Sequence, residues 1–256
     1  EEPKNTWSPF VTKVQSKKCP RAEMLLRMMQ TQGYSSLNSS TIHALRTIFG
    51  DNLVSKYHTT ELITEVADMM LPRYCNNQPL PCGPSGLCVD NELLEQIMRE
   101  ADKSFCETFT SSSGGFQYTL LDIYPFIMEL RETIVEASKL YNDYPPFHVF
   151  AGHDTVIAPV LAVLGIYQSS QYCVWPHYAS RLLLELWKNE KYPDTVYIRI
   201  VYNGKDVTSL VPSCVGNLIH DEKATFCPLE SFLSQIDHML SPYRNRGQAC
   251  LGKNRY

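Results

Sequence analysis

An apolar segment that ends in a polar pair is the feature of this sequence that most constrains its fold. Residues 147–151 are apolar apart from one histidine and read as a buried strand. Gly152, His153 and Asp154 follow, and residues 156–164 then form an apolar run that reads as a helix. α/β proteins bind ligands where the carboxyl ends of strands lead into such turns. The sequence therefore predicts an α/β fold with His153 and Asp154 at a candidate site.

The spacing of apolar residues divides the chain into a helical first half and a mixed second half. Helical spacing dominates before residue 115, and the alternation typical of strands is confined to the second half. A loop rich in Pro, Asn, Gly and Cys interrupts the helical part at residues 71–88. We expect helices at residues 20–29, 41–49, 60–71, 90–108, 124–141, 156–164 and 228–240, and an antiparallel strand pair at residues 181–187 and 195–202.

This change of pattern predicts two regions. A Ser- and Gly-rich segment at residues 111–115 marks the end of the helical part. We therefore expect residues 1–115 to form a helical cap region. Residues 116–256 are expected to form the C-terminal part of an α/β domain, in which helices flank a mixed sheet.

Composition and charge exclude several classes of protein. Of the 256 residues 44% are hydrophobic, so the chain can bury a core. The formal net charge is -4 and there is no basic stripe, which excludes nucleic acid as a partner. The longest apolar stretch near the candidate site, residues 156–166, is shorter than the roughly 20 residues that span a bilayer, so we expect no membrane contact by this segment. The first residues do not show the pattern of a signal peptide.

Nine cysteines indicate an oxidising compartment. Several lie among Pro and Gly in predicted loops, where disulfides are common, and an odd number leaves one without a partner in the chain. Cys75, Cys82 and Cys88 are an alternative zinc site, but they lack the close Cys-x-x-Cys spacing of zinc modules, so disulfides are favoured. The sequence does not determine the pairing. Asn38 begins an Asn-x-Ser pattern and is the candidate glycosylation site.

His153 and Asp154 are the residues to which the sequence assigns chemistry. A helix N-terminus presents unpaired N–H groups and a partial positive charge, which stabilise a phosphoryl group, and the His153 imidazole adds donors. Asp154 is expected to protonate a departing oxygen, a step that general acids typically accelerate by about 10² to 10⁴. The alternative is that Asp154 only caps the helix. A second pair, His220 and Asp221, falls in a predicted polar loop at residues 217–224 and lacks this setting.

Three segments of the chain resemble the histidine acid phosphatases. They are residues 150–155 around the His-Asp pair, residues 176–186 with the run Pro-His-Tyr-Ala-Ser-Arg-Leu, and residues 227–232 with Cys-Pro-Leu-Glu-Ser-Phe. The resemblance extends over residues 87–240. It implies a fold like that of phosphoglycerate mutase, with the N-terminal strands of that fold missing from these residues.

The resemblance implies a two-step phosphatase reaction that needs no metal and no cofactor. A histidine takes the phosphoryl group to form a phosphohistidine, an aspartate protonates the leaving alcohol, and water then releases phosphate. On this chain the acid would be Asp154, and His153 would contact the phosphoryl oxygens. The nucleophile of the family belongs to an Arg-His-Gly-x-Arg-x-Pro motif, which is absent from this sequence. We therefore expect these residues to be inactive by themselves.

The resemblance also implies a substrate and a location. The sequence around His153 is most similar to members of the family that act in proteoglycan linker synthesis. This implies removal of the 2-phosphate from xylose in the glycosaminoglycan–protein linkage region, by a glycoprotein in the lumen of the secretory pathway and the Golgi apparatus. It further implies partners among the glycosaminoglycan assembly machinery.

Three other functions are compatible with parts of the sequence. A non-catalytic fragment that binds a partner or a phosphorylated sugar is the main alternative, since the nucleophile motif is absent. A metal-dependent phosphohydrolase needs further ligands, for which His43 and His58 are the histidines of the helical part. A serine hydrolase is disfavoured because no Gly-x-Ser-x-Gly elbow occurs.

We expect His177 to be an exposed loop residue.

Overall fold

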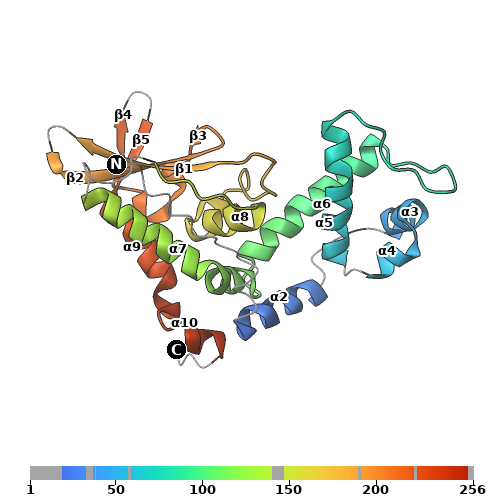
Figure 1. Ribbon diagram of the computed structural model, residues 1–256, viewed down its shortest axis with the longest axis horizontal. Helices are drawn as coiled ribbons and strands as arrows, with labels where there is room; N and C mark the ends of the chain where they lie inside the picture. Colours follow the sequence, from blue (N-terminus) through green and yellow to red (C-terminus); the bar gives the residue numbers. More distant parts are fainter. Residues whose placement is uncertain are drawn as a thin grey trace, which may run out of the picture.

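The computed structural model describes residues 19–32, 37, 39–56, 59–139, 147–189, 192–221 and 224–252 of the chain. Figure 1 shows two parts, a sheet with helices against it and a group of helices that extends away from the sheet. This architecture confirms the predicted α/β class. The α-helices are α2 (Pro20–Gln32), α3 (Ser39–Phe49), α4 (Asp51–Lys56), α5 (Thr59–Cys75), α6 (Asn91–Thr110), α7 (Gly115–Lys139), α8 (Asp154–Val163), α9 (Leu229–Leu240) and α10 (Arg246–Cys250), and the 3₁₀ turns are η1 (Ile166–Gln168), η2 (Thr208–Leu210), η3 (Pro212–Cys214) and η4 (Ser241–Tyr243).

Five strands of the described chain form one antiparallel sheet. They are β1 (Leu182–Asn189), β2 (Tyr192–Tyr202), β3 (Lys205–Asp206), β4 (Ile219–Asp221) and β5 (Ala224–Pro228). Their order is β1-β2-β5-β4, and β3 pairs with β2. The long pair of β1 and β2, whose register places Leu184 opposite Ile200, confirms the predicted antiparallel pair.

Helices α9 and α7 pack against one another beside the sheet. α9 contacts β2, and α7 contacts α9 (Figure 1). Leu229, Phe232, Ile236 and Leu240 recur at helical spacing along α9, and all four are buried. They join Ile198 of β2 in one hydrophobic core. The burial of this apolar stripe explains why the predicted final helix forms where it does.

Helix α6 connects the two parts of the molecule. It packs on α5 in the helical group, and on α7 and α8 beside the sheet (Figure 1). Asp90 caps its start, because the side chain accepts a hydrogen bond from the backbone N of Leu93 at 2.8 Å. Its buried residues include Ile97, Ala101 and Phe105, in agreement with the predicted apolar face.

Four disulfides confirm the interpretation of the cysteines. They join Cys19 to Cys250, Cys82 to Cys88, Cys106 to Cys173, and Cys214 to Cys227. Cys75 is free and exposed, in agreement with the odd count. The alternative zinc site at residues 75, 82 and 88 is wrong, because two of its three sulfur atoms are bonded to each other.

The predicted strand at residues 147–151 is wrong. These residues form neither helix nor strand, and Phe147 and Val149 are each 72% exposed. A strand needs a neighbour to complete its backbone hydrogen bonds, and none of the five described strands pairs with this segment. Phe150 nevertheless packs edge to face on Phe126 of α7, with ring centroids 5.3 Å apart. The chain therefore reaches the candidate site as irregular backbone that is anchored by one aromatic contact.

Two predicted helix boundaries and one predicted loop are also wrong. α5 continues one turn beyond Leu71 and includes Pro72, and α7 begins at Gly115 and includes Pro125. A proline removes one N–H group from a helix, and the packing of the flanking turns offsets that loss. His220 and Asp221 lie in β4 and not in a loop, because β5 supplies the backbone partners.

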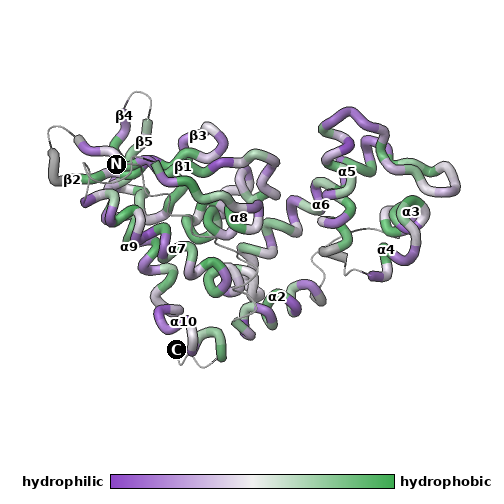
Figure 2. Tube along the Cα trace, in the orientation of Figure 1, coloured by the Kyte–Doolittle hydropathy of each residue, from purple (hydrophilic) through white to green (hydrophobic). Residues whose placement is uncertain are grey.

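The distribution of hydrophobic residues agrees with this arrangement. Figure 2 shows that α8 is hydrophobic over most of its length, and residues 158–163 of this helix are all buried. Burial of these residues leaves the polar first turn as the accessible part of α8. Within the described ranges, no helix is both long enough and apolar enough to cross a bilayer.

Candidate active site

His153 and Asp154 lie together at the start of α8. His153 is the exposed N-cap residue, and its carbonyl accepts hydrogen bonds from the N–H groups of Val156 at 2.9 Å and Ile157 at 3.1 Å. Its imidazole makes no capping hydrogen bond. Asp154 is half-buried, and its Oδ1 accepts a hydrogen bond from the backbone N of Thr155 at 2.8 Å. Both side chains thus occupy the end of the helix where the backbone dipole is positive.

Trp175 contacts the Asp154 carboxylate directly. Its indole Nε1 donates a hydrogen bond to Oδ2 of Asp154. Trp175 is only 7% exposed, so water competes weakly for this bond. With the N–H group of Thr155 on Oδ1, both oxygens of the acid now accept a hydrogen bond, which fixes its orientation.

Sequence reasoning missed Trp175. No motif marks this residue, and 21 positions separate it from Asp154. The only available signal is its place in the chain, directly before Pro176, where one of the segments that resemble the phosphatase family begins. A hydrogen bond between two such residues becomes visible only when the fold brings them together.

Three contacts from α6 hold the segment that carries Trp175. Oδ1 of Asp102 accepts a hydrogen bond from the backbone N of Trp175 at 3.0 Å. The ring of Phe105 stacks on the indole with centroids 5.6 Å apart and planes 18° apart. Cys106 is bonded to Cys173, two residues before Trp175. Because Asp102, Phe105 and Cys106 have the spacing i, i+3, i+4, a single face of α6 makes all three contacts.

A carboxyl group of α5 and a tyrosine near α8 interact electrostatically with Asp154. The pKa of Asp68, on α5, is raised by partial burial and then by the negative charges of Asp154 and Glu65. The pKa of Tyr178 is likewise raised by desolvation and by the charges of Asp68 and Asp154, with Cys75 also contributing. The start of α8 therefore lies in a negative field, and an anionic ligand here requires additional positive charge.

His177 interacts with the Asp102 carboxyl group. Burial raises the pKa of Asp102, whereas the hydrogen bond from the Trp175 backbone and the charge of His177 act in the opposite direction. His177 is exposed in a loop, as the sequence predicts.

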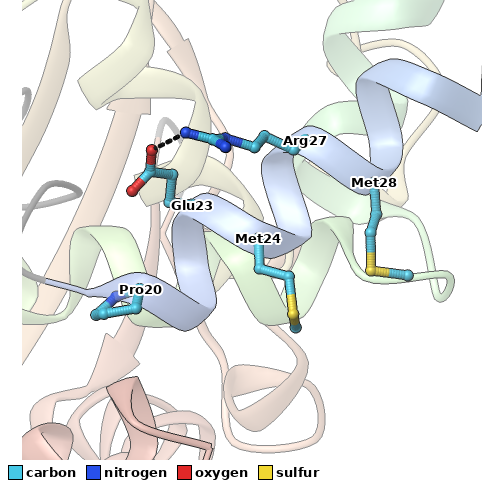
Figure 3. Close-up of a pocket in the computed structure, with 5 residues that line it drawn as sticks. All are labelled: Pro20, Glu23, Met24, Arg27 and Met28. Atoms are coloured by element: carbon cyan, nitrogen blue, oxygen red, sulfur yellow. Dashed lines mark hydrogen bonds and ion pairs between the residues drawn. The ribbon is translucent and has the colours of Figure 1, made fainter.

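A surface depression lies elsewhere, on α2 (Figure 3). It has a volume of about 350 Å³. Its lining residues are Pro20, Glu23, Met24, Arg27 and Met28. Since all of them come from one helix, and Glu23 and Arg27 are already joined in an ion pair, the depression is an open helix face. It contains none of the residues to which the sequence assigns chemistry.

The remaining candidate residues do not converge on the start of α8. Asn38, the predicted glycosylation site, lies outside the described residues, and so does His58. His43 is exposed on α3. Among the residues that the structure places, no three His, Cys, Asp or Glu side chains form a group suited to a metal ion.

Comparison with known proteins shows which family this part of the chain is similar to. Residues 119–203 match the family model of the histidine phosphatase superfamily (branch 2). The matched segment runs from α7 through the start of α8 to the end of β2, and so contains both His153 and Asp154. This match confirms the resemblance to the histidine acid phosphatases.

Several curated proteins are similar to the chain over most of its length. 2-phosphoxylose phosphatase 1 of Xenopus tropicalis is 28% identical over 165 residues, which are 64% of this chain and 31% of the frog protein. The proteins of the same name from Rattus norvegicus and Homo sapiens are each 30% identical over 166 residues, which are 65% of this chain and 33% of each relative. The chain thus spans about a third of the length of the relatives it matches.

Proposed function

We propose that this chain is the acid-bearing portion of a phosphomonoester hydrolase of the histidine acid phosphatase type. The observation that supports this most is the position of His153 and Asp154 at the start of α8, inside the segment that matches the family. In the proposal Asp154 is the proton donor and His153 contacts the phosphoryl oxygens. Neither role requires a metal or an organic cofactor.

Asp154 suits the role of general acid because its carboxyl group is held in one orientation. Cleavage of the bond between phosphorus and an ester oxygen would otherwise expel an alkoxide, which is a poor leaving group. A proton passed from the Asp154 carboxyl to that oxygen as the bond breaks yields an alcohol. The hydrogen bonds from Thr155 and Trp175 restrict the carboxyl, so less ordering is needed when the ester arrives.

His153 suits the role of phosphoryl contact because its imidazole is exposed and lies at the positive end of α8. The charges of Asp68 and Asp154 oppose the approach of a phosphate. A protonated imidazole offsets part of this repulsion and adds N–H donors. We infer that the remaining positive charge comes from groups outside these residues.

The nucleophile is also proposed to come from outside these residues. The 256-residue sequence contains no Arg-His-Gly motif. In the proposed reaction a histidine from another part of the active protein takes the phosphoryl group, and water then releases phosphate from the phosphohistidine. The chain as given is therefore expected to turn over no substrate alone.

The substrate and the location are proposed from the relatives. Because the three relatives above are named 2-phosphoxylose phosphatases, we propose a phosphorylated sugar as substrate, namely the 2-phosphate of xylose in the glycosaminoglycan linkage region. The four disulfides support a secretory compartment, for which the Golgi lumen is the proposed site. Glycosylation at Asn38 and contacts with the glycosaminoglycan assembly machinery are part of the same proposal.

A chimera tests the proposed function. In it, the residues of this chain that align with human 2-phosphoxylose phosphatase 1 replace the matching third of that relative. We expect the chimera to hydrolyse xylose 2-phosphate, and the chain alone to be inactive. Asp154→Asn in the chimera is expected to lower kcat by about 10² or more, and His153→Ala to raise KM.

The second His-Asp pair provides the matched control. His220→Ala and Asp221→Asn alter the same residue types on β4, and we expect both variants to retain the activity of the unchanged chimera. A folded chimera without phosphatase activity would contradict the proposal, as would vigorous turnover by the chain alone. A folded, inactive chimera that still binds xylose 2-phosphate would favour the alternative, a non-catalytic binding module.

A further inference from the structure

We propose that Trp175 and Asp102 are positioning residues, through which α6 of the helical group orients the acid Asp154. This inference depends on the proposed role of Asp154 as proton donor. In this inference, neither Trp175 nor Asp102 contacts the substrate. The indole of Trp175 holds the carboxylate, and Asp102 holds the backbone of Trp175.

The indole is a donor with little freedom to move. Trp175 is almost fully buried, and its ring is stacked on Phe105. Phe105 in turn packs edge to face on Phe109, with ring centroids 5.1 Å apart. A hydrogen bond from a ring held in this way costs less side-chain entropy than one from a mobile side chain. The Nε1 atom therefore defines where Oδ2 of Asp154 lies.

Three contacts hold the residues that lead into Trp175. The disulfide between Cys106 and Cys173 fastens it to α6. The hydroxyl of Tyr167 donates a hydrogen bond to the carbonyl of Val174 at 2.9 Å, which fastens it to the turn that follows α8. Asp102 adds the hydrogen bond to the backbone N of Trp175. Through these contacts, α6 and the turn that follows α8 determine where the indole lies.

Burial of an aromatic ring does not by itself explain this arrangement. A phenylalanine would keep an aromatic ring against Phe105 and would lack the N–H donor. Only the N–H group of the indole reaches Asp154, and it is the one polar atom of the side chain. The variant Trp175→Phe therefore removes the donor and retains the aromatic contact with Phe105. Trp187→Phe on β1 is the matched control, because the Trp187 indole donates to another carboxylate, that of Glu185, at 3.3 Å.

The first test measures the hydrogen bond in the chain itself. The indole N–H signals of the ¹⁵N-labelled chain are assigned with Trp175→Phe and Trp187→Phe. We expect Asp154→Ala to shift the Trp175 signal upfield and to make its N–H group exchange with water roughly tenfold faster, since its acceptor is lost. Asp102→Ala should also make the Trp175 indole N–H group exchange faster with water. Asp102→Asn should restore the slow exchange, because an amide oxygen can still accept the hydrogen bond from the backbone N of Trp175. A Trp175 signal that does not respond to Asp154→Ala would overturn the inference.

The second test measures kcat and KM separately in the chimera. We expect Trp175→Phe to lower kcat about tenfold and to leave KM within about twofold, as for the loss of one hydrogen bond that orients the acid. Asp102→Asn should retain more activity than Asp102→Ala, and Trp187→Phe should match the unchanged chimera. If Asp154→Asn lowers kcat while Trp175→Phe does not, the positioning role fails and the proposed function stands. If Asp154→Asn has no effect, or the unchanged folded chimera is inactive, the proposed function fails and the inference fails with it.

Discussion

The sulfur atoms of Cys19 and Cys250 form a disulfide that joins the start of α2 to the end of α10, across 231 positions of the sequence. α2 also contacts α7, and α10 contacts both α2 and α7. This one covalent bond therefore fastens the first described helix to the last. A disulfide that closes a long loop restricts the unfolded chain strongly, which is the basis of its effect on stability.

Removal of this disulfide is expected to destabilise the chain substantially. The double variant Cys19→Ser with Cys250→Ser should lower the free energy of unfolding by about 2 to 4 kcal/mol, measured by chemical denaturation under oxidising conditions. Cys75→Ser is the control, since that thiol is free and exposed, and it should change stability by less than about 0.5 kcal/mol. Equal denaturation midpoints for the double variant and the unchanged chain would contradict this account.

Asp122 of α7 is expected to make stability depend on pH. It is 7% exposed, and burial raises its pKa to about 6, although the charge of Arg246 and a hydrogen bond from Tyr118 act against this. A carboxyl group whose pKa is raised in the folded state binds a proton more readily when folded than when unfolded. Its contribution to stability is therefore largest at low pH, and it is lost as the pH rises through about 6.

The variant Asp122→Asn tests this directly. We expect the difference in unfolding free energy between the unchanged chain and the variant to change by about 2 kcal/mol between roughly pH 4.5 and pH 7.5, with the unchanged chain relatively more stable at the lower pH. The exposed Asp51→Asn serves as control and should show no such change. A difference that stays constant with pH would show that Asp122 is not the group responsible.

Gly83 is expected to be essential for docking the loop between α5 and α6 onto α3. A Cβ atom at this position would lie 2.8 Å from the Cα of Ile48, and closer still to the carbonyl oxygen of Thr47. Both are backbone atoms that cannot move without distorting α3. We therefore expect Gly83→Ala to cost about 1 to 3 kcal/mol in chemical denaturation. Gly247→Ala in α10 meets nothing nearer than 3.7 Å and should be close to neutral, and equal effects of the two variants would refute the steric argument.

Local patterns in the sequence predicted the elements whose causes are local. The apolar face of α6 was recognisable, because the residues that form it recur at helical spacing close together in the chain. The alternation in β1 and β2 likewise predicted their pairing, which needs only a short connection. Pairing of the cysteines was not predictable, since it depends on the folded arrangement of the helices.

The position of Asp154 could be predicted from the sequence, but its long-range contacts could not. The position of the acid at the start of a helix follows from its neighbours in the chain, and the sequence predicted it. Its hydrogen bond to Trp175 spans 21 positions, and the bond between Trp175 and Asp102 spans 73. Residues 147–151 illustrate the opposite error, because an apolar pattern alone does not make a strand when no partner strand lies beside it.

The dependence of the Asp154→Asn effect on the leaving group is the most direct test of the central claim, that Asp154 protonates the departing oxygen. The chimera and its variant are assayed with xylose 2-phosphate, whose leaving alkoxide needs a proton, and with p-nitrophenyl phosphate, whose phenolate leaves without one. We predict that the variant loses about 10² or more in kcat with the sugar phosphate and less than about tenfold with the aryl phosphate. Equal losses with both substrates would contradict the assignment of Asp154 as the general acid.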